Sequence, residues 1–138
     1  MAKALGGEVV KSDRGWGVGM SFNRVTARAE WMEPWQPGLD LLVSHQDQIE
    51  ALPPEAVVVG GSDFCPHYLM QIGEHFLGVQ GHPEFTKEYS RDLMALRREL
   101  VGDERVREGE TSLIATVDDT LMARWILNFL QRAITARG

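Results

Sequence analysis

The spacing of apolar residues divides the sequence into a first part with short strands and a second part with helices. In the first part, short apolar runs are separated by glycine, proline and polar clusters, which is typical of strands. Strands are predicted at residues 8–11, 15–21, 23–29, 40–44, 56–60, 69–73 and 75–80. The runs 15–21 and 23–29 are expected to pair as a small antiparallel meander, and the last two strands as a hairpin. The near-continuous apolar run 56–60 is of the kind found in strands covered on both faces.

Helical signals stand at both ends of the strand-rich part. Residues 1–5, followed by Gly6-Gly7, look like the last turn of a helix with a glycine cap. An amphipathic helix is predicted over residues 86–101, with an apolar face of Phe85, Tyr89, Leu93, Leu96 and Leu100. The charged residues 102–110 predict a solvated connector, a short mobile helix or a disordered loop. Asp118 is placed to cap a last helix, whose core-facing stripe is Leu121, Met122, Trp125, Ile126, Phe129, Leu130 and Ala133.

Length and composition predict a single domain, or part of one, over residues 1–138. The formal charge is 14 minus 20, or −6, without a lysine or arginine block, which argues against nucleic acid or an anionic membrane surface as a partner. No apolar stretch is long enough to span a bilayer, and the first residues lack the apolar core of a secretory signal, so a cytoplasmic location is expected. Cys65 is the only cysteine, which excludes an internal disulfide or a cysteine-rich zinc site.

The chemically informative segment is Gly81-His82-Pro83-Glu84-Phe85, which follows the last predicted strand. Pro83 favours an extended conformation at His82, and side chains two residues apart on an extended chain point to the same side. Their Cα atoms are then about 6.5 Å apart, so His82 and Glu84 can contact each other. A histidine held by a carboxylate is the base half of a nucleophilic triad. The spacing alone also leaves open a purely structural pair at the end of a strand.

The segment from Gly78 to Phe85, Gly-Val-Gln-Gly-His-Pro-Glu-Phe, resembles the C-terminal signature of class I glutamine amidotransferases. In that family the histidine and glutamate activate a cysteine that attacks the side-chain amide of glutamine. Residues 43–53 resemble the family's stretch beside the glutamine pocket, and residues 4–10 resemble the end of the helix that follows the nucleophile. The amidotransferase domain of GMP synthase is the most similar group. The resemblance implies part of a flavodoxin-like, doubly wound α/β sheet with a small antiparallel β insertion and C-terminal helices.

The resemblance also implies the site residues. His82 and Glu84 are the expected catalytic residues, and Ser44, Gln46 and Asp47 the expected contacts for glutamine or another γ-glutamyl small molecule. No cofactor and no metal are implied. His45, next to the pocket in the resemblance, is expected to pack or to form hydrogen bonds without taking a catalytic step.

The cysteine nucleophile of the family lies in a Gly-x-Cys-x-Gly-x-Gln elbow before the segment that resembles residues 4–10, so it is expected to be absent from this chain. Cys65 is not expected to replace it, because an acid lies two residues away at Asp63 and no glycine elbow surrounds it. The alternative is a catalytically inactive fragment or interaction subunit. It would pair with the missing N-terminal half or with a second copy, because losing a central strand exposes unpaired backbone.

Two other kinds of site have little support in the sequence. A metal site built from His45, His67, His75 and His82 would match no common zinc spacing. The glycine-spaced residues 15–19 do not open a helix after a strand, as a dinucleotide-binding loop would. Both are set aside.

Overall fold

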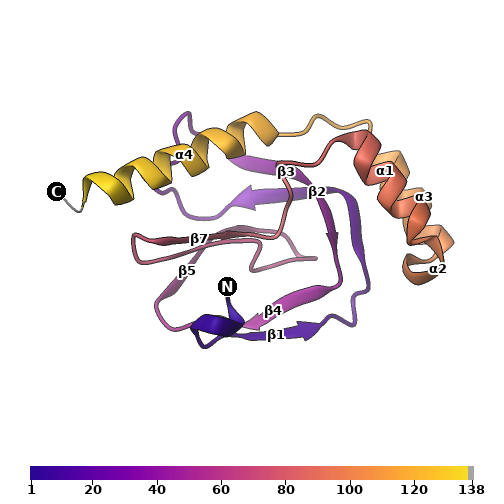
Figure 1. Ribbon diagram of the computed structural model, residues 1–138, viewed down its shortest axis with the longest axis horizontal. Helices are drawn as coiled ribbons and strands as arrows, with labels where there is room; N and C mark the ends of the chain where they lie inside the picture. Colours follow the sequence, from indigo (N-terminus) through magenta and orange to yellow (C-terminus); the bar gives the residue numbers. More distant parts are fainter. Residues whose placement is uncertain (137–138) are drawn as a thin grey trace.

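The computed structural model describes residues 1–136, and its strands precede most of its helices along the chain (Figure 1). A 3₁₀ turn, η1 (Lys3–Leu5), ends at Gly6 with a left-handed φ of 95°, as the glycine cap predicted. The strands are β1 (Glu8–Lys11), β2 (Gly17–Val25), β3 (Gly38–His45), β4 (Asp47–Ala51), β5 (Ala56–Gly61), β6 (Leu69–Ile72) and β7 (Phe76–Val79). The helices are α1 (Lys87–Leu96), α2 (Arg98–Val101), α3 (Asp103–Ser112) and α4 (Asp119–Thr135). None of the helices in this described part is long and apolar enough to cross a membrane.

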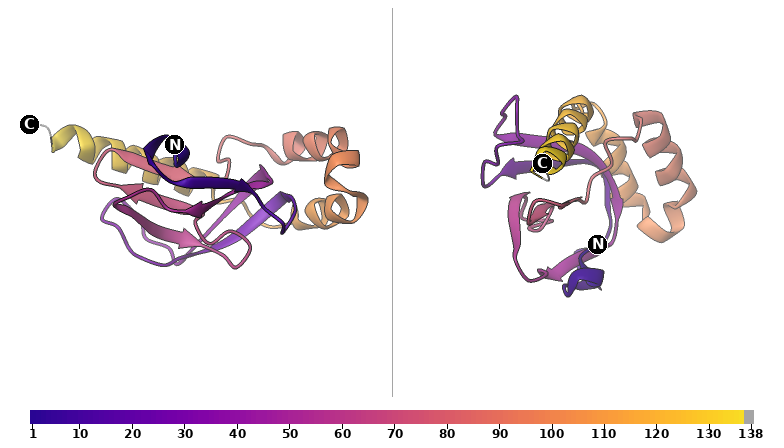
Figure 2. Two further views of the ribbon diagram at one scale, coloured as in Figure 1. Left: turned by 90° about the horizontal axis from the view of Figure 1, so that it is seen from below. Right: turned by 60° about the vertical axis from the view of Figure 1, so that its left-hand side comes forward.

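The larger sheet has five strands in the order β3-β2-β5-β6-β7, and each of its pairings is antiparallel. β1 and β4 form a separate antiparallel pair. Figure 2 shows the strands curled around the interior, with the helices outside them. This mixed α/β fold, with an antiparallel sheet and C-terminal helices, confirms the expected fold class. The parallel strands of a doubly wound sheet are not among the pairings within residues 1–136.

The segment after β7 connects the two edge strands of the curled sheet. Gln80 donates its backbone N–H to the carbonyl of Tyr68 at 2.9 Å, and His82 donates its own to the carbonyl of Leu42 in β3 at 2.8 Å. We call residues 80–82 the seam. Gly81 at its centre has no room for a side chain, because a Cβ there would overlap the Tyr68 hydroxyl and lie 2.8 Å from Leu41 Cβ. The seam places His82 against the edge of β3.

Two apolar clusters pack against opposite faces of β3. Leu41 and Leu42 are adjacent and therefore point to opposite faces of the strand. The cluster around Leu41 includes Trp125 of α4, and the cluster around Leu42 includes Met94 of α1 and Val106 of α3. The helices thus hold β3, and with it the backbone partner of His82, from both sides.

A single strand replaces the predicted meander. β2 runs unbroken from Gly17 to Val25 and pairs with β3, so residues 15–21 do not pair with residues 23–29. Gly19 has a φ of 74°, and a Cβ there would lie 2.5 Å from the carbonyl oxygen of Gly109. The glycine therefore allows α3 to approach the strand closely instead of marking a turn. β5 was predicted to be covered on both faces, but this cover is only partial, since the side chain of Val57 is 56% exposed.

The charged segment 102–110 is not a solvated loop, because it forms most of α3 and packs on β2. Val106 and Gly109 are buried on its inner side, and Leu113 follows just beyond its end. The Ser112 hydroxyl accepts a hydrogen bond from the backbone N–H of Met20 at 2.9 Å. Of the predicted alternatives the helix is the one that forms, whereas the solvated connector and the disordered loop are wrong, because a few small and apolar residues of the segment make the contact with β2.

The predicted helix over residues 86–101 is broken into α1 and α2 at Arg97. Met94 is buried, whereas Leu96 and Leu100, expected on the apolar face, are 83% and 64% exposed. Leu96 lies within α1 but away from its buried face, which is formed by Ser90 and Met94, and Leu100 lies beyond the break.

Asp118 precedes α4 as predicted, but its side chain does not cap the helix. Its carboxylate accepts from the backbone N–H of Asp40 at 2.8 Å, and its own N–H donates to the Asp40 carbonyl at 2.8 Å. The helix start is therefore tied to β3. The core-facing stripe is confirmed at Met122 and Trp125, which are fully buried, whereas Leu130 is 50% exposed.

Candidate functional site

The predicted His–Glu contact forms at the end of the seam, between its last residue and Glu84. His82 Nδ1 lies 2.7 Å from Glu84 Oε1. The side chains are 36% and 64% exposed, so both can be reached from outside. Because an ionised carboxylate can only accept a hydrogen bond, Nδ1 is the donor and Nε2 is the nitrogen left to exchange a proton.

The state of Glu84 supports that assignment. Its partial burial would raise the pKa of this carboxyl, but the hydrogen bond from His82 and a backbone hydrogen bond outweigh it, so the pKa lies below its usual value. Glu84 is therefore ionised at neutral pH. An ionised partner holds the imidazole in one tautomer and stabilises a positive charge that develops on it.

Phe85 is a part of this site that the sequence analysis did not assign. Its ring stacks on the imidazole of His82 with centroids 4.1 Å apart and planes 5° apart. Tyr89 in turn packs edge-on against Phe85, with centroids 4.7 Å apart. The apolar spacing predicted Phe85 on the apolar face of a helix. Its position directly after the His-Pro-Glu motif was the only signal available.

The expected substrate contacts lie at the turn between β3 and β4. The Ser44 hydroxyl accepts a hydrogen bond from Arg97 Nη1 at 3.1 Å, and the carbonyl of Gln46 accepts one from the backbone of Ser12 at 3.0 Å. Asp47 is exposed at the start of β4. The seam joins β3 two residues before Ser44. The turn and the His–Glu pair are therefore attached to the same strand, although the structure gives no direct contact between them.

His45 lies at the same turn and is electrostatically coupled to His82. Its Nδ1 is 3.0 Å from the carbonyl oxygen of Asp47. Burial lowers the pKa of His45, the carbonyl of Asp47 opposes this, and the charge of nearby His82 lowers it further. Burial thus favours the neutral form of His45, and its packing or hydrogen-bonding role stays a prediction.

A cavity of about 260 Å³ opens beside this turn. His45, Asp47, Tyr68 and Gln80 are among its lining residues, while Ser44 and Gln46 are not. Gln80 belongs to the seam, two residues before His82. The cavity therefore places part of the expected substrate-binding stretch near the backbone that carries the histidine.

Cys65 is not arranged as a nucleophile. Its side chain is only 3% exposed, and burial raises the pKa of the thiol to about 11, with Arg14 opposing the rise. A thiol in that state is protonated at neutral pH, whereas the thiolate is the reactive form. The expectation that Cys65 does not replace the family's cysteine is in accord with this geometry.

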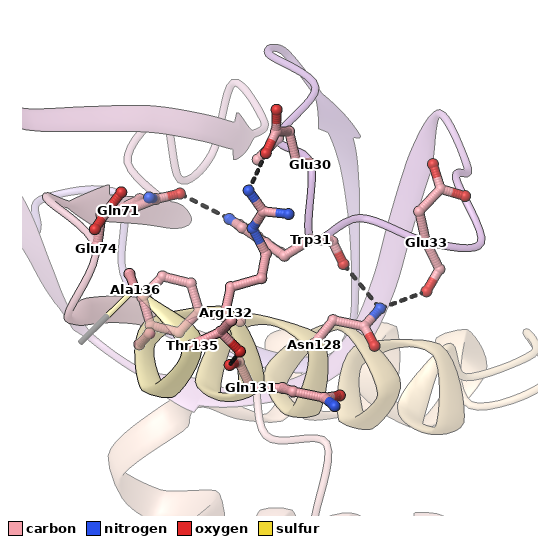
Figure 3. A pocket seen from close by; sticks show the side chains of 13 residues that line it. Glu30, Trp31, Glu33, Gln71, Glu74, Asn128, Gln131, Arg132, Thr135 and Ala136 are labelled. Carbon is pink, nitrogen blue, oxygen red and sulfur yellow. Dashed lines mark hydrogen bonds and ion pairs between the residues drawn. The ribbon is translucent and has the colours of Figure 1, made fainter. Parts of the chain in front are cut away.

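A larger cavity, about 810 Å³, lies elsewhere, between α4 and the chain around residues 29–33 (Figure 3). We call it the α4 groove. Asn128 donates to the carbonyl oxygens of Trp31 at 3.0 Å and Glu33 at 2.7 Å. The indole of Trp31 donates to the side-chain oxygen of Gln71 at 2.7 Å. These polar groups fasten the groove walls to each other.

The charged groups of the α4 groove are also largely paired. Figure 3 shows Arg132 of α4 reaching Glu30 across the opening. Glu33 pairs with Arg28 at 2.6 Å. Within residues 1–136, no group of three or more histidine, cysteine or acidic residues is arranged to hold a metal ion. The groove therefore shows the hydrogen bonding of a structural contact.

Comparison with known proteins identifies relatives of this chain. Over 96 residues it is 30% identical to γ-glutamyl peptidase 3 of Arabidopsis thaliana, covering 67% of this chain and 39% of that protein. Over 106 residues it is 33% identical to the glutamine-hydrolysing GMP synthase of Proteus mirabilis (strain HI4320), covering 71% of this chain and 20% of that protein. The chain thus spans well under half of these curated relatives. No family model matches it.

Solved structures share the fold. A glutamine amidotransferase from Thermotoga maritima has a TM-score of 0.68 at 18% identity, covering 96% of this chain and 56% of that one. A glutamine amidotransferase from Methylobacillus flagellatus has a TM-score of 0.62 at 22% identity, covering 92% and 58%. Together with the sequence relatives, these matches confirm the resemblance to class I glutamine amidotransferases.

Proposed function

Because the chain is a relative of the glutamine amidotransferases, we propose that it supplies the histidine–glutamate part of a cysteine-dependent site that hydrolyses the side-chain amide of glutamine. The products are glutamate and ammonia for transfer. Glutamine and other γ-glutamyl compounds present the same γ-acyl carbon, so both substrate classes fit the proposal. The sequence relatives, which include a γ-glutamyl peptidase and a glutamine-hydrolysing GMP synthase, support it.

The observation that carries the proposal is the 2.7 Å contact between His82 Nδ1 and Glu84 Oε1 beside the seam. It leaves Nε2 as the proton-exchanging atom on a partly exposed ring. Ser44, Gln46 and Asp47 would hold the substrate at the neighbouring turn. We propose that the cysteine comes from a segment outside residues 1–138, with which this chain pairs.

In the proposed reaction, a cysteine thiolate attacks the amide carbon, a C–S bond forms and the C–N bond breaks. Imidazolium at His82 gives its proton to the leaving ammonia. Neutral His82 then takes a proton from water, which attacks the thioester and releases glutamate as the C–S bond breaks. Glu84 keeps the imidazole in one tautomer through both steps.

The test joins residues 1–138 to the nucleophile-bearing N-terminal portion of a related amidotransferase, in place of that protein's own C-terminal portion. Glutamate release from glutamine is then measured for the chimera and for its His82→Asn and Cys65→Ala forms. We expect activity that falls on the order of 10³-fold in the His82→Asn form, since proton transfer is lost. Cys65→Ala should keep it. The unaltered 138-residue chain is assayed alongside and should be inactive by itself.

Far-ultraviolet circular dichroism and a cooperative thermal transition establish that each chimera is folded. A folded chimera whose activity is the same with and without His82 would overturn the proposal. Loss of activity in the Cys65→Ala form, at unchanged stability, would instead identify Cys65 as the nucleophile.

A further inference from the structure

We propose that Phe85 is a positioning residue for His82: its stacked ring fixes the plane of the imidazole, so that Nδ1 meets Glu84 while Nε2 is held unpaired in one direction. This inference rests on the proposed function for its catalytic meaning. Its geometric content can be tested without any activity.

A hydrogen bond to one ring nitrogen does not fix an imidazole. The imidazole can still turn about the side-chain torsions χ1 and χ2 while Nδ1 stays within hydrogen-bond distance of Glu84 Oε1, and such turning changes the direction of Nε2. The Phe85 ring, 4.1 Å away and tilted by only 5°, covers one face and blocks that rotation. The hydrogen bond and the stack together define the plane and the direction of Nε2.

The local backbone makes this contact persistent. The backbone N–H of Phe85 donates to the carbonyl of His82 at 3.2 Å, so a turn folds the two rings over each other. Thr86 then caps α1, its hydroxyl accepting from the backbone N–H of Tyr89 at 3.1 Å. That cap brings the Tyr89 ring against Phe85, 4.7 Å between centroids and 68° between planes. Phe85 is therefore held between the imidazole and the first turn of the helix.

Packing alone does not explain the arrangement. Phe85 also touches the apolar cluster around Leu42, which any large apolar side chain would satisfy. A near-parallel stack on an imidazole, in contrast, needs a flat ring at position 85. The matched substitutions are thus Phe85→Leu, which keeps the apolar volume, and Phe85→Tyr, which keeps the ring. Leu96→Ala is the control, since Leu96 lies on the same helix α1 and its side chain is 83% exposed.

The experiment records the imidazole C–H signals of the complete 138-residue chain by nuclear magnetic resonance, with the His82 signals assigned by their loss in His82→Asn. An aromatic ring shifts protons above its face upfield. We expect His82 signals upfield of those of exposed His75. They should move downfield in Phe85→Leu and stay in place in Phe85→Tyr and Leu96→Ala. Unfolding temperatures show that the variants remain folded.

In the active chimera, Phe85→Leu should lower kcat on the order of 10- to 100-fold, the scale expected for a misplaced catalytic group, with KM nearly unchanged. Phe85→Tyr should restore it. Identical His82 signals in the wild-type chain and in Phe85→Leu would overturn the stacking. Moved signals with an unchanged kcat would overturn the positioning role. If the chimera is folded but its activity does not depend on His82, the proposed function fails, and the resonance result still decides whether Phe85 holds the ring.

Discussion

The α4 groove and the segment around His82 differ in what their polar groups have left to offer a ligand. The groove is about three times the volume of the cavity beside the β3–β4 turn, about 810 Å³ against about 260 Å³. Yet the side chains of Trp31 and Asn128 donate hydrogen bonds to neighbouring residues of the chain, and Arg132 forms an ion pair with Glu30. At the other site, His82 uses one ring nitrogen, and Nε2 has no partner within residues 1–136.

The comparison teaches that a polar group which is held in place but has no partner is a better guide to a chemical site than the volume of a cavity. A buried polar group with its partners in place stabilises the fold and has nothing further to donate. A ring nitrogen that is held in position but unpaired can accept a proton from a reactant. Damage to the two regions should therefore appear in different measurements.

The largest expected effect outside the proposed active site comes from Trp125→Ala in α4. Trp125 is fully buried, packs edge-on against Trp31 with centroids 6.0 Å apart and donates to the Pro34 carbonyl at 2.9 Å. Its removal should cost about 3–5 kcal/mol of the free energy of unfolding, measured by denaturant titration. Leu127→Ala, on the exposed side of the same helix, is the control. If Trp125→Ala lowered activity in the fully folded chimera, the division between the two regions would be broken.

An intermediate effect is expected from pH, at the other region. Since burial lowers the pKa of His45 below its ordinary value of 6.5, the unfolded chain takes up a proton there before the folded one does. The free energy of unfolding should therefore decrease as the pH falls from about 7.5 to about 5.5. His45→Gln should flatten this dependence, whereas substitution of exposed His75 should not. An unaltered profile in His45→Gln would show that this histidine is not held neutral by the fold.

Glu84 affects stability at lower pH. Because its pKa is lowered by folding, the ionised carboxylate stabilises the fold above pH 4.5, and this contribution is lost as the pH falls further.

The smallest effect is expected from Glu30→Gln at the rim of the α4 groove. Arg132 and Glu30 have side chains that are 56% and 77% exposed, and such ion pairs contribute less than about 1 kcal/mol. The temperature of thermal unfolding should fall by less than about 4 °C, the shift that about 1 kcal/mol produces in a chain of this size. A much larger loss would mean that the groove depends on this pair, and the contrast between the two regions would then lie in electrostatics as well as in hydrogen bonding.

Much of the local structure was predictable from short-range signals. The hairpin of β6 and β7 and the glycine-capped first turn are where the sequence placed them. The contact of His82 with Glu84 also followed from the geometry of two extended residues around a proline. In each case, neighbouring residues alone determine the outcome.

The features that were missed depend on residues far apart in the sequence. α3 packs through Gly109 against Gly19, two glycines that no periodicity connects. The carboxylate of Asp118 binds the backbone of Asp40 in place of its own helix. The stack of Phe85 on His82 is local, but it needs a side-chain direction that apolar spacing does not specify. Long-range partners and ring orientation are thus the information that pattern analysis lacks.

The seam has a mechanical consequence. A sheet with two free edges can splay, whereas the bonds from Gln80 to Tyr68 and from His82 to Leu42 close this one into a ring of strands. The backbone that carries the imidazole is bonded within this closed sheet, so the imidazole should move only when the strands around it move together. Breaking the bond from His82 to Leu42 would therefore release the imidazole from β3 while the five strands of the sheet keep their pairings.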